Sequence, residues 1–352
     1  MRPLVVRAGS ALLDGELRRA TLLIEAGSLS AVDPSVVPPD ARVVECAVAS
    51  PGFVDLHVHA LDGAGTIGQP DVPGLSKALA RRGVTAFLAT TVAAPVEDLL
   101  PLLSPVEVAG ARCLGVHLEG PWLSPAHAGA QPPEALSAPA LPDLEQLLAA
   151  GPPRMLTLAP ELPGADAVIA RAVEAGVVVA LGHSGATYDE AVAAVAAGAS
   201  HVTHCFNAMR PLHHREPGLP GAAVDLPDVT VEVIADGVHL HPAVVRMLWR
   251  ACGADRVCLV SDAVDLGLPG TDAARLADGT LAGSRMGLDQ AVRNLVAWGV
   301  PLVDALTMAS VTPGARLGVP ALAVGAPADL VLLSSALEPI MTVAGGEVVW
   351  EA

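Results

Sequence analysis

Two histidines separated by one residue, His57 and His59, lie at the end of the β-branched run GFVDLHV and directly after it. Alternate side chains of a strand share one face, so both imidazoles can point at a single ion. Taken alone, such a pair is more often two satisfied core or surface histidines. Other runs of the same kind end in further ionisable side chains, which are Glu119, His183, His204 and Asp262. Buried charges need a metal ion or hydrogen bonds to compensate them, so the six residues together indicate a site of metal ligands or acid–base groups rather than structural strand ends.

The elements that must hold these residues are eight short β-branched runs, which alternate with alanine-rich stretches of helical periodicity. This alternation over about 260 residues is typical of a (β/α)8 TIM-like barrel, with a doubly wound sheet as the alternative. The barrel is favoured because the ionisable residues end five different runs, as they do in barrel enzymes. The runs cover residues 52–58, 84–92, 113–120, 154–161, 177–184, 201–207, 229–236 and 256–263.

Both ends of the chain read as short strands and turns that could not bury an apolar face alone. The sequence therefore predicts a small β-sandwich domain built from residues 1–50 and 316–352, with the barrel at 51–315 inserted between them. Three long loops, 121–153, 208–222 and 264–283, each follow a predicted barrel strand, on the face where barrels hold their sites.

Composition excludes several kinds of partner. The 352 residues include 20 basic and 37 acidic ones, a net charge of −17, which argues against nucleic acid and anionic membranes as partners. No apolar run reaches the roughly 20 residues of a spanning helix. The five cysteines form no CxxC pair. These features predict a soluble cytoplasmic protein without disulfides.

Several motifs together resemble one known family. In order along the chain, PGFVDLHVH, HLEGPWLSP, GHSGAT, THCFNAM, REPGL, ADGVH and LVSDA are similar to the N-acetylglucosamine-6-phosphate deacetylases of the amidohydrolase superfamily. The HxH pair is common to the superfamily, whereas HLEGP with FNAM and REPGL is specific to this family. The resemblance runs from about residue 50 to the end, where GAPADLVLL is similar to the superfamily's closing strand.

The resemblance implies a metal centre with one or two divalent ions, zinc being favoured and iron or another ion the alternative. Glu119, His183 and His204 match the family's main ligands. His57 and His59 match a pair that contributes to a second ion in some members only. Asp262 matches the catalytic acid–base.

The resemblance also implies a substrate site and a homodimer, in which Arg215 grips the sugar phosphate across the subunit interface. One departure is Gln131, since family members usually carry histidine there, and glutamine holds no positive charge. His127 and the pair His213–His214 are nearby candidates to compensate. The expected substrate-binding residues are Ala130, Gln131, Asn207, the backbone at Ala208, Arg215, His239 and Leu281.

The residue inventory separates this chain from some relatives. Many binuclear amidohydrolases bridge two ions with a carboxylated lysine on a barrel strand. The one lysine here, Lys77, lies within a predicted helix, so a bridge between two ions must be Glu119. This separates the chain from hydantoinase-like and dihydroorotase-like enzymes.

Other polar residues near the motifs have alternative interpretations. His117 is either a support for the ligands or a satisfied core histidine. His201 is expected to be structural and to face away from His204. His241 is expected to cap the helix that follows, and Asp236 either orients His239 or only forms a turn.

The predicted function is hydrolysis of N-acetylglucosamine-6-phosphate to glucosamine-6-phosphate and acetate. Three alternatives stay open. The substrate could be N-acetylgalactosamine-6-phosphate or another N-acyl compound, or the chain could be a catalytically inert assembly subunit with an amidohydrolase-like barrel.

Overall fold

The fold is known from a computed structural model that describes residues 2–66, 68, 70–265 and 273–352. Its largest sheet has eight parallel strands in the order β12-β11-β10-β9-β8-β7-β6-β5. A parallel bridge between Val58 and Ala263 links the two outermost strands, which closes the sheet into a barrel. The strands are β5 (Phe53–Val58), β6 (Val84–Thr90), β7 (Arg112–Glu119), β8 (Met155–Leu158), β9 (Val178–Leu181), β10 (His201–Val202), β11 (Thr230–Ile234) and β12 (Val257–Val260). The predicted barrel is therefore confirmed over the doubly wound sheet.

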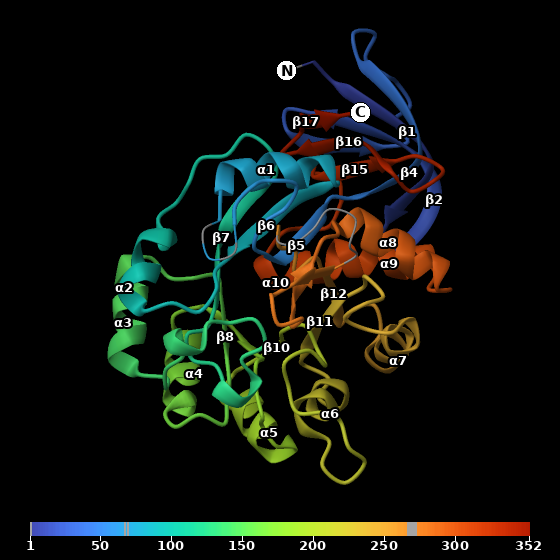
Figure 1. The fold of residues 1–352 in the computed structure, drawn as a ribbon. Coiled ribbons are helices and arrows are strands. Elements are labelled where there is room, and N and C mark those ends of the chain that lie inside the picture. The colour runs from blue at the N-terminus through green and yellow to red at the C-terminus, as the bar shows by residue number, and fades with distance from the viewer. Residues whose placement is uncertain (1, 67, 69, 266–272) are drawn as a thin grey trace.

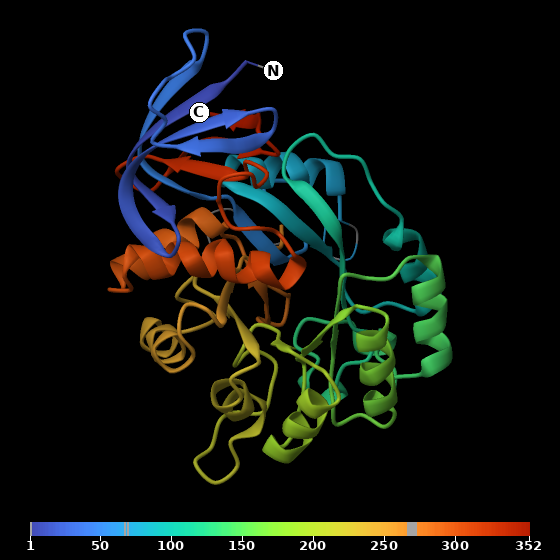
Figure 2. The ribbon, with the colours of Figure 1, turned by 180° about the vertical axis from the view of Figure 1, so that it is seen from behind.

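Helices pack around this barrel, as Figures 1 and 2 show from opposite sides. Helices such as α1, α7 and α8 have an apolar face because their apolar residues recur at helical spacing. The helices are α1 (Val72–Arg81), α2 (Val96–Leu99), α3 (Leu141–Ala150), α4 (Ala165–Glu174), α5 (Tyr188–Ala196), α6 (Gly218–Asp225), α7 (Pro242–Cys252), α8 (Leu288–Ala297), α9 (Leu302–Ala309) and α10 (Val311–Leu317). No helix in the described ranges is long and apolar enough to cross a membrane.

Local sequence determines where several helices begin. His241 is confirmed as the cap of α7, because its Nδ1 accepts the backbone N–H of Ala243 at 3.1 Å. At α5 the Thr187 hydroxyl accepts the N–H of Glu190, whose carboxylate in turn accepts the N–H of Thr187. These bonds satisfy amide groups that the first turn of a helix otherwise leaves unpaired.

A second sheet combines both ends of the chain in the order β17-β16-β15-β4-β1-β2-β3. Blue strands from the N-terminal end and red strands from the C-terminal end lie side by side in both views (Figures 1 and 2). It encloses a core of its own, to which β1, β2, β15 and β16 all contribute. The small β-domain built from both ends is therefore confirmed, while its boundaries at residues 50 and 316 stay a prediction. The strands are β1 (Leu4–Leu13), β2 (Glu16–Glu25), β3 (Ser28–Val32), β4 (Arg42–Pro51), β15 (Leu330–Leu333), β16 (Pro339–Ala344) and β17 (Glu347–Glu351).

Strand β4 carries the chain from this domain into the barrel. It pairs in parallel with β1 and antiparallel with β15, and only Gly52 separates it from β5. A side chain at Gly52 would have its Cβ 2.1 Å from Thr85 of β6, so the chain can pass here only with glycine. The strand that carries His57 is thus a continuation of the β-domain.

A short hairpin stands in the loop after β12, which the sequence had indicated only as a long loop. Its strands are β13 (Ala273–Arg275) and β14 (Leu281–Ser284), paired antiparallel. Residues 266–272 of the same loop lie outside the described ranges. The hairpin brings Arg275 and Leu281 to the carboxyl end of the barrel.

Several polar contacts join the β-domain to the barrel, and two of them use a buried side chain of the β-domain. Arg112 at the start of β7 forms an ion pair with Asp329, whose side chain is 4% exposed. Asp329 also accepts the backbone N–H of Gly345 at 2.7 Å. The hydroxyl of Thr342 on β16 donates to the carbonyl of Ala80 on α1 at 2.7 Å. These bonds satisfy polar groups that the contact between the two parts buries.

Replacing Arg112 with methionine is expected to destabilise the protein by about 1–3 kcal/mol, because the buried Asp329 carboxylate loses its counter-charge. Arg42→Met is the matched control. Arg42 is as exposed as Arg112, at 40%, but its partner Glu351 is 46% exposed. The control should cost about 0–1 kcal/mol. Urea unfolding measures both, and equal losses would show that burial of the acid does not decide the effect.

Candidate active site

The predicted site residues meet in a cavity of about 450 Å³ at the carboxyl end of the barrel. Five of the six predicted ligand and acid–base residues line it, and His57 lies beneath with no exposed surface. Six of the seven predicted substrate-binding residues also line it, which are Ala130, Gln131, Asn207, Ala208, His239 and Leu281. Arg215 is not among the residues lining the cavity. The individual roles of all these residues stay predictions.

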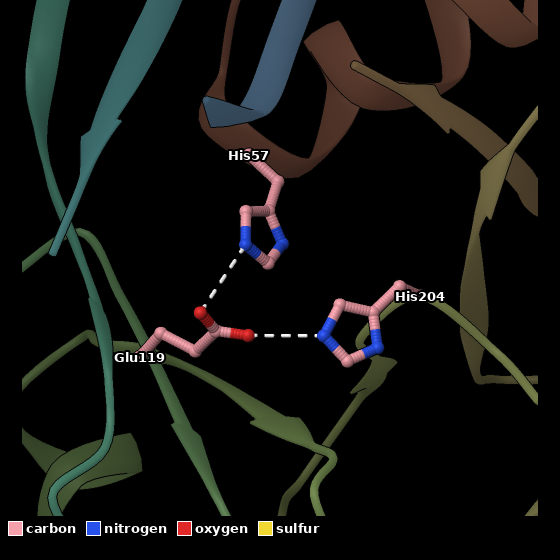
Figure 3. Close-up of side chains that lie close together, drawn as sticks. All are labelled: His57, Glu119 and His204. Carbon is pink, nitrogen blue, oxygen red and sulfur yellow. Dashed lines mark hydrogen bonds and ion pairs between the residues drawn. The ribbon is translucent and has the colours of Figure 1, made fainter. Parts of the chain in front are cut away.

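Glu119 lies at the centre of the ionisable cluster, and its two carboxylate oxygens face two different pairs of histidines. Oε1 is 3.0 Å from Nε2 of His183 and 3.0 Å from Nε2 of His204. Oε2 is 3.6 Å from Nε2 of His57 and 3.5 Å from Nε2 of His59. Figure 3 shows one carboxylate oxygen of Glu119 directed at His57 and the other directed at His204. One carboxylate therefore connects all four imidazoles.

Asp262 completes the half of the cluster around His57. Its Oδ1 is 3.5 Å from Nε2 of His57 and 3.4 Å from Nε2 of His59. The two Nε2 atoms are only 3.3 Å apart. Potential donor atoms of His57, His59 and Asp262 lie within 4.8 Å of one another, as do those of His57, Glu119 and His204. Nitrogen and carboxylate oxygen atoms that converge in this way fit a divalent metal ion.

The electrostatics of the cluster favour a cation. Burial alone would lower the pKa of His57, but Glu119, Asp262 and Glu232 together hold it well above its usual value. Burial would raise the pKa of Glu119, yet the neighbouring His57 and His183 hold it well below its usual range. Several buried carboxylates thus stabilise positive charge at one place. Protonated imidazoles or a metal ion can supply that charge.

The backbone at the strand ends is bent in a way that side-chain alternation cannot anticipate. His183, His204 and Asp262 have φ angles of +47°, +24° and +43°, in the left-handed region that residues with a Cβ rarely adopt. Such strain is characteristic of functional sites, where the surrounding structure enforces it. Here it turns each side chain inward as its strand ends.

His201 is buried and does not line the cavity, as expected of a structural residue, but the expectation that it faces away from His204 is wrong. Its Nε2 lies 3.0 Å from Oε1 of Glu232, a buried carboxylate that also contacts His57. Strand alternation does not extend to His204, because the left-handed turn intervenes. Glu232 is not among the residues predicted from the sequence, although an isolated acid inside the apolar run VTVEVIAD was a signal.

His117 has a structural environment. Its Nδ1 lies 3.0 Å from the carbonyl of Leu56, and its Nε2 lies 2.7 Å from the hydroxyl of Thr157. Burial lowers its pKa to about 3, and the charge of His57 lowers it as well. A neutral imidazole packed at 4.7 Å from the His57 ring therefore supports the ligand strands.

Gln131 contacts the ionisable cluster directly. Its Nε2 donates to Oε2 of Glu119 at 2.6 Å, while its Oε1 accepts the backbone N–H of Ala93 at 2.8 Å. Both polar atoms of the Gln131 amide are thus bonded, one to Glu119 and the other to the backbone that fixes the amide in place. An uncharged amide suits this double role, since it donates and accepts at once.

The histidines considered as replacements for the missing family histidine lie in different places. The backbone carbonyl of His127 accepts a hydrogen bond from Nδ1 of His183 at 3.0 Å. His213, His214 and Arg215 lie on an exposed turn, where Nη1 of Arg215 is 2.8 Å from Nε2 of His214. None of these four residues lines the cavity.

Asp236 orients His239 and also forms the turn, so both interpretations hold. Its Oδ2 is 2.6 Å from Nδ1 of His239, and its Oδ1 accepts the backbone N–H groups of Val238 and His239. Arg275, which the sequence analysis did not single out, is the lone arginine or lysine among the described residues that line the cavity. Its Nη1 donates to the carbonyl of Gly279 within the hairpin at 2.8 Å.

A closed parallel barrel with histidine and carboxylate side chains at its strand ends is typical of metal-dependent hydrolases. Comparison with known proteins places the chain in this class. The chain belongs to the amidohydrolase family, whose model matches residues 48–349. The lysine that would bridge two ions in some relatives is absent from the site, because Lys77 lies exposed on α1.

Particular relatives are deacetylases of amino sugar phosphates, so the resemblance found in the sequence is confirmed. The chain is 38% identical to N-acetylgalactosamine-6-phosphate deacetylase of Escherichia coli O157:H7, over 87% of each chain. It is 37% identical to N-acetylglucosamine-6-phosphate deacetylase of Vibrio furnissii, over 86% of this chain and 83% of that one. A mutant deacetylase of Mycobacterium smegmatis, solved in complex with N-acetyl-D-glucosamine-6-phosphate, superposes with a TM-score of 0.88 and 37% identity, covering 99% and 100% of the two chains.

Chelator-treated protein is expected to gain stability when a divalent ion is added back, because the ion binds only the folded cluster. The gain is about 4 kcal/mol at a free ion concentration 1,000 times Kd. Glu119→Gln should abolish most of it, whereas Glu174→Gln, at an acid that is 77% exposed on α4, should not. Thermal unfolding with and without zinc measures the effect. Identical curves for the stripped and reloaded protein would rule out a metal site here.

Proposed function

We propose that this enzyme hydrolyses the acetyl group of N-acetylglucosamine-6-phosphate, giving glucosamine-6-phosphate and acetate. The observation that carries the proposal is Glu119 between two histidine pairs, with Asp262 beside it, at the floor of a cavity large enough for a sugar phosphate. Deacetylases of amino sugar phosphates that are similar over most of the chain support the same substrate class.

The residues present fit one or two divalent ions. Glu119, His183 and His204 would hold the first, and His57, His59 and a shared Glu119 the second, with zinc favoured among the ions that such ligands accept. A divalent ion there supplies Lewis acidity, which polarises the acyl oxygen and makes an attacking water more acidic.

Asp262 is the proposed acid–base. Burial would raise its pKa, but the neighbouring His57 and His59 hold it below its usual value, so the group is a carboxylate near neutral pH. In this form Asp262 accepts a proton from the attacking water and then returns it to the leaving amine. Asp262 lines the cavity, so its carboxylate faces the space that the substrate would fill.

His239 is the proposed hydrogen-bond donor to the acyl oxygen of the substrate. Its Nδ1 is engaged by Asp236, which leaves its other ring nitrogen for the substrate. Burial alone would lower the pKa of His239, but hydrogen bonding to Asp236 and the charge of Asp262 raise it above its usual value. A donor at this place stabilises negative charge as it develops on the oxygen. Ala130, Asn207, Ala208 and Leu281 complete the proposed substrate wall.

The phosphate requires a cation, and two arginines are candidates. Arg215 lies outside the cavity of its own chain, which agrees with the proposal that the protein is a homodimer and that Arg215 reaches the partner's substrate. Arg275 lines the cavity within one chain. A planar guanidinium can bind a phosphate through two hydrogen bonds, so either can serve.

A second candidate substrate is N-acetylgalactosamine-6-phosphate, because a relative at 38% identity carries that specificity in its name. An inert assembly subunit fits less well, since the four histidines, Glu119 and Asp262 are all in place. We also propose a cytoplasmic location, which the five unpaired cysteines support.

Asp262→Asn is expected to lower kcat at least about 10³-fold, while the fold and the bound metal are retained, because asparagine cannot accept a proton. Asp265→Asn is the matched control, since Asp265 is exposed, accepts the backbone N–H of Gly63 and is not among the residues that line the cavity. Steady-state rates and metal analysis of the same samples give the result. Turnover that survives in Asp262→Asn would remove this residue from the acid–base role.

Arg215→Met is expected to raise KM for the phosphorylated sugar about tenfold or more, with little change in kcat or in activity on unphosphorylated N-acetylglucosamine. Arg275→Met is measured beside it, along with the molar mass in solution. A selective rise in KM for Arg275→Met alone would mean that the phosphate is held within one chain. Both epimers are assayed with the wild type, and turnover of neither would refute the proposed activity.

A further inference from the structure

Glu232 lies beneath the site as a carboxylate with no exposed surface, in the middle of the apolar strand β11. Removing an ionised carboxylate from water costs several kcal/mol unless hydrogen bonds and charges compensate. Its side chain lies outside the cavity, so it does not meet the substrate. A buried acid in this place therefore needs another role, and its hydrogen-bond partners indicate which one.

The first partner is the ring of His57. Nδ1 of His57 lies 3.1 Å from Oε2 of Glu232, so this nitrogen carries the proton and donates it to the carboxylate. Nε2 is then the nitrogen with the free lone pair. It faces Oε2 of Glu119 at 3.6 Å and Oδ1 of Asp262 at 3.5 Å, where a cation would lie. Glu232 thus selects both the orientation and the tautomer of His57.

The second partner is the backbone of His204. The N–H of His204 donates to the same Oε2 of Glu232 at 3.0 Å. This is the residue whose φ of +24° is strained, and a charged acceptor compensates for part of that strain. One oxygen atom therefore holds a histidine from each of the two pairs that flank Glu119.

The other oxygen of Glu232 is anchored from below. Oε1 lies 3.0 Å from Nε2 of His201, and Nδ1 of His201 lies 2.6 Å from the hydroxyl of Thr230. Both oxygens of the carboxylate are thereby fixed, and the group cannot rotate without breaking bonds on each side. His201, Glu232 and His57 form one continuous chain of hydrogen bonds that ends at the metal-binding cluster.

We propose that Glu232 is a positioning residue for the metal centre, which presents Nε2 of His57 to a second divalent ion and holds His204 in the geometry needed for the first. The inference rests on the proposed metal-dependent function of the site. Removing an acceptor that orients a metal-binding imidazole typically weakens metal affinity about 10–100-fold. The ion on the His57 side should suffer most, because there Glu232 contacts the imidazole ring itself.

The test is zinc binding by wild type and Glu232→Gln, measured as ions per chain over a series of buffered zinc concentrations. We expect two ions in the wild type, and in the variant a second ion about 10–100-fold weaker with the first changed much less. Asp289→Asn is the matched control, because Asp289 is also a buried acid but pairs with Arg293 on α8 and does not line the cavity. It should leave both zinc affinities unchanged. Equal zinc binding by wild type and Glu232→Gln would overturn the proposal.

A second readout follows the tautomer directly. In ¹⁵N spectra of zinc-loaded protein, His57 should carry its one proton on Nδ1 in the wild type, and this N–H signal should shift and broaden in Glu232→Gln. In a His57→Ala background, adding Glu232→Gln should change the affinity of the remaining ion by less than about threefold, because the main pathway of its effect is gone. A loss of about tenfold or more in the affinity of that remaining ion would overturn the role assigned to His57.

If Glu232→Gln fails to fold, His201→Asn provides the same test, since it removes a donor to Glu232 without touching a ligand. It should weaken the second ion in the same direction by a smaller factor, and unchanged affinity would count against the proposal. The zinc measurements need no substrate. If wild type deacetylates neither sugar phosphate but the zinc affinities differ as expected, the proposed function fails while the role of Glu232 stands.

Discussion

The site depends on one carboxylate, Glu119, which must be ionised although it is 2% exposed. Water cannot compensate its charge, so the protein must do so with imidazoles, the Gln131 amide and a cation. The barrel provides these partners, because the carboxyl ends of all its parallel strands lie around the same end of the barrel. Residues far apart in the chain can therefore each contribute one partner to the same anion. The inward turns at His183 and His204 bring those partners within 3.0 Å of it.

Much of this arrangement could be predicted, because the sequence carries two independent patterns. Alternation of β-branched runs with helical stretches predicts the barrel, and the ionisable residue that ends a run predicts where its side chain will lie. The reasoning fails where backbone geometry departs from the strand pattern. His201 was misplaced because alternation stops before His204, whose φ is +24°. Glu232 was missed because a single acid within an apolar strand has no spacing pattern, and only the folded barrel shows that it lies beneath His57.

Gln131 and Arg215 show two different limits of sequence comparison. The departure at Gln131 suggested a loss of charge near the substrate, yet the amide is occupied at both ends by Glu119 and the backbone of Ala93. Arg215 shows the opposite case, in which a matching residue lies outside the cavity of its own chain. The charges next to a bound phosphate, rather than the net charge of the protein, decide whether it binds. A protein of net charge −17 can receive a phosphate, because an arginine and a cation centre act at contact distance while the remaining charges are screened.

The passage from β4 through Gly52 into β5 has a consequence for how the chain is made. Strand β4 pairs with β1 on one side and with β15 on the other, and β15 begins only at Leu330. During synthesis, the side of β4 that receives β15 therefore stays unpaired until almost all of the barrel has left the ribosome. An open strand edge is a template for wrong pairing between chains. The barrel's first strand thus emerges early from a domain that is completed last, and for most of the synthesis one edge of β4 is open to such pairing.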